Sequence, residues 1–445
     1  MLYDFIQERM CQFSNQIISD ETRKFTYSEF VSATECFSRG LILPKYGVLC
    51  KSELNTALGV FACIKAGVTA VPLSARYGEV HVNQIIQHMN ISHIITDENG
   101  VLEVKKMSEL IDETEDLIDV ALIMCTSGTT GKPKGAMITY ENLIANLQDI
   151  ERYFKINDSD TILIARPIYH CAVLTGEFFI SLCCGLNIRF YNGEFSPFRL
   201  IQEISDSQVT VLGGTPTLFY HLCQMIGRSK MKLPLRVIAV SGECMTESVA
   251  DTMRKTLPDT DIYSVYGLTE ASPRVSALPP EQFDKYPLSV GFHLQSVAIK
   301  IENSELLIKG KTIMKGYYNE PTQTSKVLND NWLHTGDSAV MDGEGRITVK
   351  GRIDNMIIRA GMNIFPQEIE NALKSHSRIF EVLAYGEQKD VTQKICVKVK
   401  TDCLNKADIM GICQKHLPAY AIPDEVEIVD FIPRNASGKL IRTKI

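Results

Sequence analysis

The sequence predicts an α/β protein with a large N-terminal domain of parallel-rich, helix-flanked sheets, a β-rich subdomain and a small C-terminal α+β domain. Up to about residue 290, short apolar runs rich in β-branched residues alternate with segments of helical spacing, which is typical of a parallel sheet covered by helices. Beyond that point, glycine turns separate strand-like segments. Because 445 residues exceed the usual size of one domain, two or more folded units are expected.

The N-terminal alternation is regular. Strand-like runs at 48–50, 70–73 and 92–96 enclose expected helices at 54–66 and 79–89. Further strands, each followed by a helical segment, are predicted at 161–165, 187–191, 209–212 and 237–240. The pattern therefore predicts repeated strand–helix units.

After about residue 290 the sequence no longer alternates strands with helices. Three strands are predicted in the β-rich stretch, at 297–301, 305–309 and 346–349. After Gly351 the chain predicts a helix at 365–374 that begins with Pro366, and then further elements. These are strands at 381–385 and 394–399 and a helix at 406–417. The predicted domains are 1–353, with the β-rich subdomain at about 290–350, and 354–445.

Composition excludes several functional classes. The 46 Lys and Arg against 53 Asp and Glu leave a net charge of −7, which does not favour nucleic acid as a partner. Asp4 and Glu8 interrupt the N-terminus where a secretory signal would be basic and then apolar, and no apolar run is long enough to span a bilayer. We therefore expect a cytoplasmic protein without membrane insertion.

Thirteen cysteines are scattered along the chain, and none forms a CxxC pair. This pattern favours reduced, mostly buried thiols over a disulfide framework or a zinc site. A catalytic cysteine remains the alternative.

The most distinctive segment is Thr126-Ser-Gly-Thr-Thr-Gly-Lys-Pro-Lys-Gly135, which follows the apolar run 120–124. Its glycines, hydroxyls and two lysines are suited to surrounding phosphate oxygens. The glycine and lysine spacing is not that of a Walker A loop. By composition alone, a flexible surface loop is the alternative.

Five further motifs follow in order along the chain. They are Pro167–His170, Tyr266–Glu270, Trp332–Asp337, Gly351–Asp354 with Gly361–Glu368, and Pro433–Lys439. Together with the glycine-rich loop they resemble the signature motifs of the adenylate-forming (AMP-binding) enzymes, which include acyl-CoA and aryl-CoA synthetases. The resemblance extends from about residue 120 to residue 440.

The resemblance implies an acid–thiol ligase that uses ATP and Mg²⁺. A carboxylate attacks the α-phosphorus of ATP and expels pyrophosphate, and a thiol then displaces AMP from the acyl-adenylate. The acceptor would be coenzyme A or, alternatively, the phosphopantetheine of a carrier protein in a siderophore or other secondary-metabolite pathway. A non-catalytic ATP-binding regulator is the alternative from another class.

The resemblance also assigns residues to the nucleotide. Tyr266 would contact adenine, Thr269 the α-phosphate, and Glu270 the metal ion. Asp337 would accept both ribose hydroxyls, and Arg352 would contact ribose or phosphate. Phosphate binding falls to Thr126, Ser127, Gly128, Thr129, Thr130, Gly131, Lys132 and Lys134. The adenine side would include Glu243 and Cys244, although the stretch around them departs from the family pattern.

The C-terminal motifs imply a moving domain. Lys439 would reach the active site during adenylation and bridge the substrate carboxylate and the α-phosphate. Asp354 matches the hinge about which the small domain swings between the two half-reactions. The stretch around Gly361 would then line the thiol tunnel.

The acid pocket is predicted from the same motifs. Residues after Tyr169 supply no carboxylate, so the ammonium of an ordinary α-amino acid would lack a partner. His170 would gate the carboxylate site. The pocket lining would be small or apolar, comprising Cys171, Gly214, Gly242, Val265, Gly267 and Ser272. An aromatic or medium-length acyl acid fits these residues best.

Overall fold

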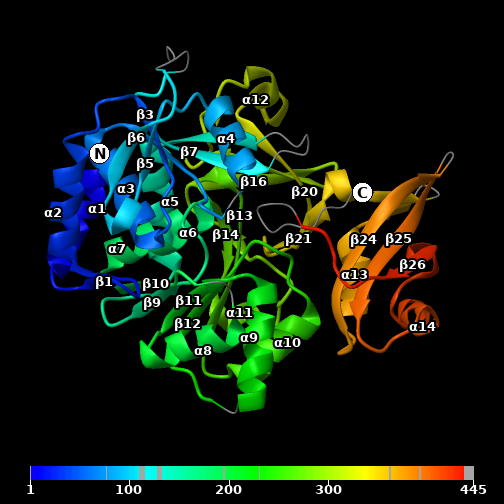
Figure 1. Ribbon diagram of the computed structural model, residues 1–445. Helices are drawn as coiled ribbons and strands as arrows, with labels where there is room; N and C mark the ends of the chain where they lie inside the picture. The colour runs from blue at the N-terminus through cyan, green and yellow to red at the C-terminus, as the bar shows by residue number, and fades with distance from the viewer. Residues whose placement is uncertain are drawn as a thin grey trace.

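The computed structural model describes residues 2–76, 78–109, 116–127, 133–193, 196–229, 231–359, 362–389 and 392–434. It is an α/β protein with a large N-terminal lobe and a smaller C-terminal lobe (Figure 1). The predicted fold class is confirmed. Among the described helices, none is both long enough and apolar enough to cross a membrane.

One large sheet forms the centre of the N-terminal lobe. Its inner strands run parallel, and its edges are antiparallel. In spatial order the strands are β15 (Phe292–His293), β14 (Arg274–Leu278), β13 (Asp261–Gly267), β12 (Val237–Val240), β11 (Val211–Gly214), β9 (Thr161–Ile164), β10 (Asn187–Phe190), β1 (Ile17–Ser19) and β2 (Lys24–Thr26). Because parallel strands end at the same edge, the carboxyl ends of β11, β12 and β13 meet there.

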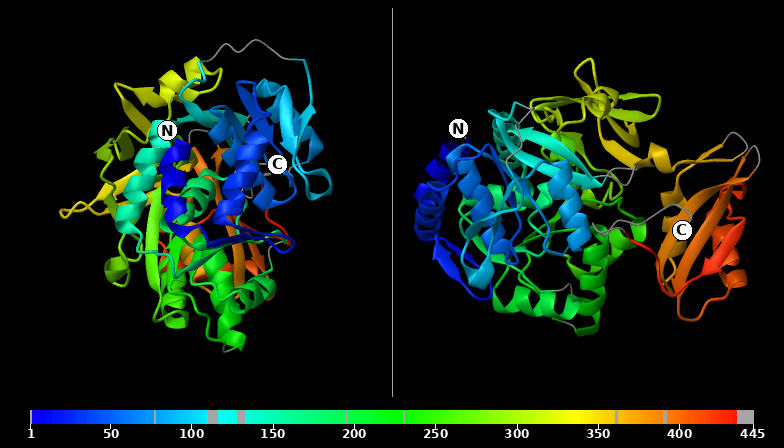
Figure 2. Two further views of the ribbon diagram at one scale, coloured as in Figure 1. Left: turned by 90° about the vertical axis from the view of Figure 1, so that its left-hand side faces the viewer. Right: turned by 45° about the horizontal axis from the view of Figure 1, so that its top comes forward.

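A second sheet lies beside the first in the N-terminal lobe (Figure 2). Its order is β18 (Gly316–Tyr317), β8 (Pro133–Thr139), β7 (Val120–Ser127), β4 (Thr69–Pro72), β3 (Lys45–Val48), β5 (His93–Thr96) and β6 (Glu103–Lys106). Strands β3, β4, β5 and β7 are parallel, and β8, β18 and β6 are antiparallel additions.

Helices separate and cover the two sheets. The helix α3 (Glu53–Ala66) is buried from Leu54 to Ile64, so it lies in the interior rather than on a surface. One hydrophobic core joins α3 to residues of both sheets, and a second core lies under helices on the other face of the large sheet. The helices of this lobe are α1 (Leu2–Met10), α2 (Tyr27–Ser38), α4 (Glu79–His88), α5 (Tyr140–Tyr153), α6 (Cys171–Val173), a π-helical turn (Leu174–Phe179), α7 (Ile180–Cys184), α8 (Pro197–Asp206), α9 (Pro216–Ser229), α10 (Glu247–Thr256), α11 (Pro280–Phe283) and α12 (Pro321–Val327).

The predicted β-rich stretch forms an antiparallel sheet. Its strands are β16 (Val297–Glu302), β17 (Glu305–Gly310), β20 (Trp332–Met341), β19 (Leu328–Asn329) and β21 (Ile347–Arg352). A 3₁₀ turn (Ile353–Asn355) connects β21 to the C-terminal lobe. The domain limits at residues 353 and 354 stay a prediction.

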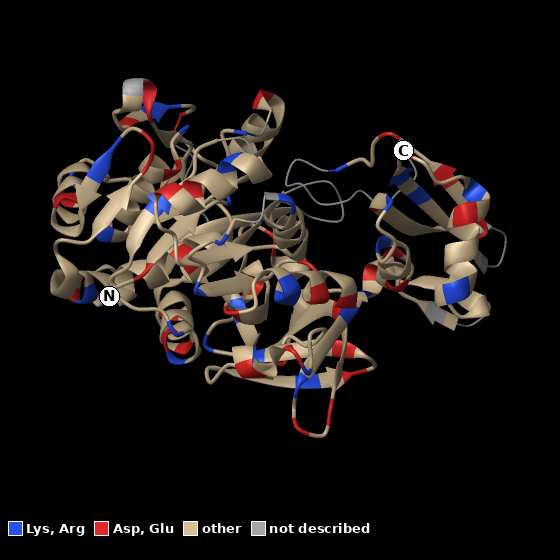
Figure 3. Cartoon of the chain, turned by 90° about the horizontal axis from the view of Figure 1, so that it is seen from below, with Lys and Arg blue, Asp and Glu red and all other residues tan. Residues whose placement is uncertain are grey.

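The C-terminal lobe has its own hydrophobic core. Its elements are β22 (Ile357–Arg359), β23 (Met362–Ile364), α13 (Pro366–Lys374), β24 (Ile379–Lys389), β25 (Thr392–Thr401), α14 (Lys406–His416) and β26 (Glu425–Ile428). Helix α13 begins at Pro366, and Asn405 and Asp408 cap α14 reciprocally. Acidic and basic residues are interspersed along the chain in both lobes when it is seen from below (Figure 3).

Candidate active site

The glycine-rich loop lies between two paired strands. Strands β7 and β8 are antiparallel, and Thr126 lies opposite Lys134. The hydroxyl of Thr126 donates to the carbonyl of Lys134 at 3.5 Å. The pairing therefore holds the two ends of the loop together. The loop residues Gly128, Thr129, Thr130, Gly131 and Lys132, and the side chain of Ser127, lie outside the described residues.

Tyr317, a residue outside the motifs, contacts both Glu270 and Lys134. The hydroxyl of Tyr317 donates to Oε1 of Glu270 at 2.7 Å, and Nζ of Lys134 lies 5.2 Å from the centroid of the Tyr317 ring. Strand β18 carries Tyr317 and pairs with β8, which carries Lys134. Burial and the nearby Glu270 raise the pKa of Tyr317 well above its usual value, so its hydroxyl stays a donor. Thr269 begins the 3₁₀ turn that includes Glu270.

A second cluster joins Tyr266, Asp337 and Arg352. The Tyr266 hydroxyl donates to Oδ2 of Asp337 at 2.6 Å, and Nη1 of Arg352 lies 3.5 Å from Oδ1. Burial raises the pKa of Asp337, while Tyr266 and Arg352 favour its charged form. The structure therefore brings together the three residues that the resemblance assigns to adenine and ribose.

The backbone around Asp337 explains its fixed position. Gly336 has a φ of +68°, and its N–H donates to Oε1 of Glu305 at 2.9 Å. A Cβ on Gly336 would lie 2.6 Å from Nη2 of Arg352, so a larger residue would displace the guanidinium. Arg352 also donates to the carbonyl of Thr335 at 2.5 Å. Through Nη2 it contacts Asp354, the predicted hinge residue, at 3.2 Å.

Several residues predicted for the acid pocket lie at the carboxyl ends of neighbouring strands. Gly214 ends β11, Gly242 follows β12 with a φ of +91°, and Val265 and Gly267 lie at the end of β13. A Cβ on Gly267 would lie 1.9 Å from the carbonyl oxygen of Pro273, so only glycine fits there. The structure thus brings these four positions to one edge of the sheet.

The remaining pocket residues differ in their surroundings. His170 precedes α6, and its ring centroid lies 4.3 Å from that of Tyr169. Cys171 is buried, and burial raises the pKa of its thiol to about 12, which disfavours a thiolate nucleophile. Ser272 is fully buried, and its hydroxyl donates to the carbonyl of Thr312 at 2.7 Å. Its pocket role stays a prediction.

Glu243 and Cys244 have partners of their own. A carboxylate oxygen of Glu243 accepts hydrogen bonds from the backbone N–H and the hydroxyl of Thr217, at 3.2 and 2.6 Å. This contact lies in the first turn of α9, where backbone N–H groups need acceptors. The Cys244 thiol donates to the carbonyl of Val349 at 3.9 Å. Lys439 and Gly361 lie outside the described residues, so their roles also stay predictions.

Comparison with known proteins identifies the family. The model of the AMP-binding enzyme family matches residues 7–318, and that of its C-terminal domain matches residues 368–439. The chain belongs to the AMP-binding enzyme family. The resemblance that the motifs indicated is therefore confirmed.

Individual relatives are acid–CoA ligases by name. The long-chain-fatty-acid–CoA ligase of Salmonella typhimurium is 31% identical over 346 residues, which cover 74% of this chain and 61% of that protein. The 2-succinylbenzoate–CoA ligase of Bacillus licheniformis is 28% identical, with 89% and 88% covered. The structure of o-succinylbenzoate CoA synthetase from Bacillus subtilis matches with a TM-score of 0.86 at 24% identity, covering 99% of this chain and 97% of that one. This last likeness shows the fold.

The donor set fits the magnesium ion that family membership implies. Mg²⁺ is bound by one or two carboxylates together with phosphate oxygens and water. Glu270 supplies such a carboxylate. Among the described residues, its side chain bonds to Tyr317 through one oxygen only.

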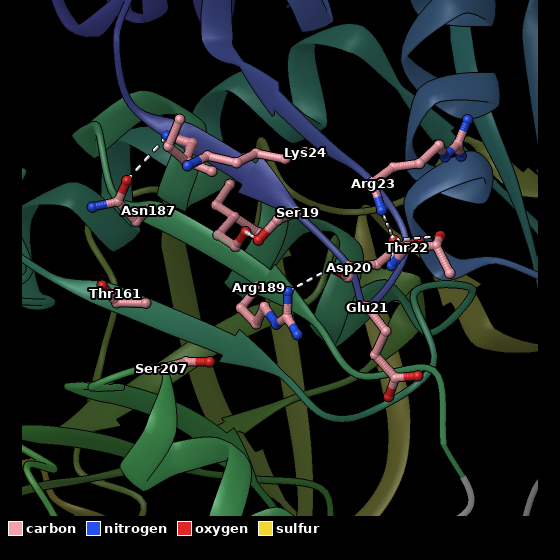
Figure 4. A pocket seen from close by; sticks show the side chains of 12 residues that line it. Ser19, Asp20, Glu21, Thr22, Arg23, Lys24, Thr161, Asn187, Arg189 and Ser207 are labelled. Atoms are coloured by element: carbon pink, nitrogen blue, oxygen red, sulfur yellow. Dashed lines mark hydrogen bonds between the residues drawn. The ribbon is translucent and has the colours of Figure 1, made fainter.

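A surface hollow of about 500 Å³ lies elsewhere on this AMP-binding enzyme (Figure 4). It is lined by the β1–β2 turn and β10, at the far edge of the large sheet from β13. Two of its charged groups already have partners: Arg189 bonds to Glu203 and to the carbonyl of Asp20, and the Asp20 carboxylate accepts from the hydroxyl of Thr22. Because of its place at the far edge, the hollow includes none of the residues predicted to bind the nucleotide.

Proposed function

We propose that this protein activates a carboxylic acid with ATP and transfers the acyl group to coenzyme A. The observation that carries the proposal is the pair of clusters just described, Glu270 with Tyr317 and Lys134, and Asp337 with Tyr266 and Arg352. These groups combine a metal-binding carboxylate, a cation for phosphate and a largely buried acceptor for ribose hydroxyls. Relatives named as fatty-acid, succinylbenzoate and feruloyl ligases support an acyl or aryl acid.

In the first half-reaction, a carboxylate oxygen of the acid attacks the α-phosphorus of ATP, and the bond to pyrophosphate breaks. Lys134 and the glycine-rich loop stabilise the charge on the departing phosphates. Glu270, oriented by Tyr317, would hold Mg²⁺, which neutralises phosphate charge when bound. Asp337 accepts the ribose hydroxyls and fixes the nucleotide, and Thr269 contacts the α-phosphate. Lys439 compensates the charge of the approaching carboxylate.

In the second half-reaction, the thiol sulfur attacks the acyl carbonyl and AMP leaves. The proposed C-terminal domain, residues 354–445, would rotate about Asp354 to remove Lys439 and admit the thiol past Gly361. Such rotation needs a pivot outside both cores, and the 3₁₀ turn Ile353–Asn355 lies between them.

We also place this reaction in the cytoplasm. In the described part of the chain the thirteen cysteines form no disulfide, and several are buried. Thiols that stay reduced are typical of a reducing compartment.

Pyrophosphate exchange tests the first half-reaction. Purified protein would be incubated with ATP, Mg²⁺, labelled pyrophosphate and each of a panel of fatty, aryl and amino acids. We expect exchange with an acyl or aryl acid, and loss of exchange in Lys439→Ala. Absence of exchange with every acid would refute the proposal, and a preferred α-amino acid would overturn the pocket assignment.

Mass spectrometry tests the acceptor. The exchanging acid would be incubated with ATP and either coenzyme A or a phosphopantetheinylated carrier protein. We expect the acyl-CoA mass with coenzyme A. Acylation of the carrier protein alone would instead assign the second half-reaction to carrier loading.

A further inference from the structure

Arg274 is a buried cation beside the predicted acid pocket. It lies on β14 opposite Gly267, and only 2% of the residue is exposed. The Asn146 amide holds its backbone from both sides, accepting from the N–H at 3.3 Å and donating to the carbonyl at 2.8 Å. The strand and Asn146 together fix the base of this side chain.

The guanidinium rests against Gly176 in the π-helical turn. A Cβ on Gly176 would lie 2.5 Å from Nη2 and 2.7 Å from Nε of Arg274, so the glycine leaves the space that the guanidinium fills. A π-helical turn is uncommon and is often found at functional sites. Gly176 follows Cys171, a predicted pocket residue, by five residues, in the helical segment that Cys171 begins.

The guanidinium has no anionic partner among the described residues. Its Nε is buried without a hydrogen bond, and no carboxylate in the described part of the chain forms an ion pair with the guanidinium. Arg346, another buried arginine, contacts Asp342 at 2.8 Å and Glu344 at 2.5 Å. A buried, unpaired charge strongly disfavours the folded state, so a bound anion would relieve a penalty here.

Arg274 is a neighbour of two residues predicted for the acid pocket. It lies opposite Gly267 on the adjoining strand. Burial raises the pKa of the Cys171 thiol, and the charge of Arg274 lowers it while that of Glu270 raises it. An acid bound against Gly267 and Cys171 would therefore have the guanidinium of Arg274 beside it.

We propose that the acid substrate is a dicarboxylate, whose second carboxylate binds Arg274. This inference rests on the proposed function and narrows its substrate class. Arg274 is then a specificity-determining residue: its donors pair with the distal carboxylate, while the opposite carboxylate is adenylated.

Matched pairs of acids test the inference in pyrophosphate exchange. Hexanoate is compared with hexanedioate, and benzoate with isophthalate, so that the members of each pair differ by one carboxylate. A charge-assisted bond predicts a kcat/KM about 100-fold higher for the preferred diacid than for its monoacid. Preference for the monoacid in both pairs overturns the inference while leaving the proposed function intact; no exchange with any acid refutes the proposed function itself.

Arg274→Met separates charge recognition from packing. We expect a loss of about 100-fold in kcat/KM for the diacid, with the monoacid unchanged or improved. An equal loss for both acids overturns the inference, because a structural residue would affect both alike. Arg274→Lys retains the charge without the planar fork and should recover part of the diacid preference. Arg254→Met is the control: it removes the guanidinium of Arg254 on α10, which pairs with Asp284, and should leave the diacid preference unchanged.

Thermal unfolding provides a readout independent of turnover. With AMP present, the diacid should raise the Tm of the wild type and leave that of Arg274→Met unchanged. Without ligands, Arg274→Met should be as stable as the wild type or more stable, because the substitution removes an uncompensated buried charge. If the methionine variant does not fold, the diacid preference of the wild type and the Arg274→Lys kinetics decide the question. A diacid that stabilises the methionine variant as much as the wild type contradicts the inference.

Discussion

Asp337→Asn should weaken ATP binding. It should also stabilise the unliganded protein at neutral pH, because it removes a charge that is largely buried. The wild-type carboxylate, whose side chain is 14% exposed, can accept both ribose hydroxyls, whereas an amide keeps a single oxygen acceptor. One lost charge-assisted hydrogen bond costs about 1.5–3 kcal/mol. Since 1.4 kcal/mol corresponds to a factor of ten, the KM for ATP should rise roughly 10- to 150-fold.

Although Asp337→Asn weakens ATP binding, it should raise the thermal stability of the unliganded protein relative to the wild type as the pH rises. Burial raises the pKa of Asp337, so the folded protein binds this proton more tightly than the unfolded chain. Wild-type stability should therefore fall as the pH rises from about 4, the usual aspartate value, through the raised pKa. Asparagine does not titrate. The Tm of the variant minus that of the wild type should become more positive between pH 4 and pH 8.

The assay combines exchange kinetics with thermal unfolding across that pH range. Asp342→Asn, in the exposed turn after β20, is the matched control and should leave the KM for ATP unchanged. An unchanged KM for ATP in Asp337→Asn would refute the ribose assignment. Parallel Tm curves for variant and wild type would refute the electrostatic reasoning.

Two further substitutions test the rest of the site. Tyr317→Phe removes the donor to Glu270 and should raise the Mg²⁺ concentration for half-maximal exchange about 10- to 100-fold. Tyr318→Phe is the control, because the hydroxyl of Tyr318 contacts Lys45 and not Glu270. An equal Mg²⁺ requirement in both variants would contradict the proposal that Tyr317 orients Glu270. Gly267→Ala places a Cβ 1.9 Å from a carbonyl oxygen and should lower both Tm and exchange, whereas Gly227→Ala, with open space around it, should not. An unaltered Tm in Gly267→Ala would show that β14 can shift.

Elements with strong local signals were predictable from the sequence. The strand at 237–240 has the bounds of β12, and the helices predicted at 365–374 and 406–417 match α13 and α14 within one residue. The spacing of apolar residues, together with a proline or a capping residue at the start of a helix, is enough to predict these elements. Strand β8 was missed because Pro133, Lys134 and Gly135 read as loop, and only its pairing with β7 makes a strand of them.

Tyr317 shows what local pattern cannot provide. Tyr317 ends strand β18, and Tyr318 follows it directly in a turn, yet the two side chains have different partners. The first contacts Glu270, and the second accepts a hydrogen bond from Lys45 at 2.6 Å. These partners lie 47 and 273 residues away in sequence, so the choice between the two tyrosines depends on the packed sheets. Arg274 could not be predicted from the sequence for the same reason: whether its guanidinium has a partner depends on all the residues that the fold packs around it.

Arg352 links the proposed ribose site to the proposed hinge, and its two carboxylate contacts differ in strength. Its contact with Asp354 joins side chains that are 43% and 59% exposed, and such pairs contribute at most about 1 kcal/mol. The side chain of Asp337 is only 14% exposed, and the carbonyl of Thr335 holds the same guanidinium. The contact with Asp354 can therefore break while Arg352 stays on Asp337. Because the contact with Asp354 is the weaker of the two, the C-terminal lobe could rotate between half-reactions while Arg352 and Asp337 keep hold of the nucleotide.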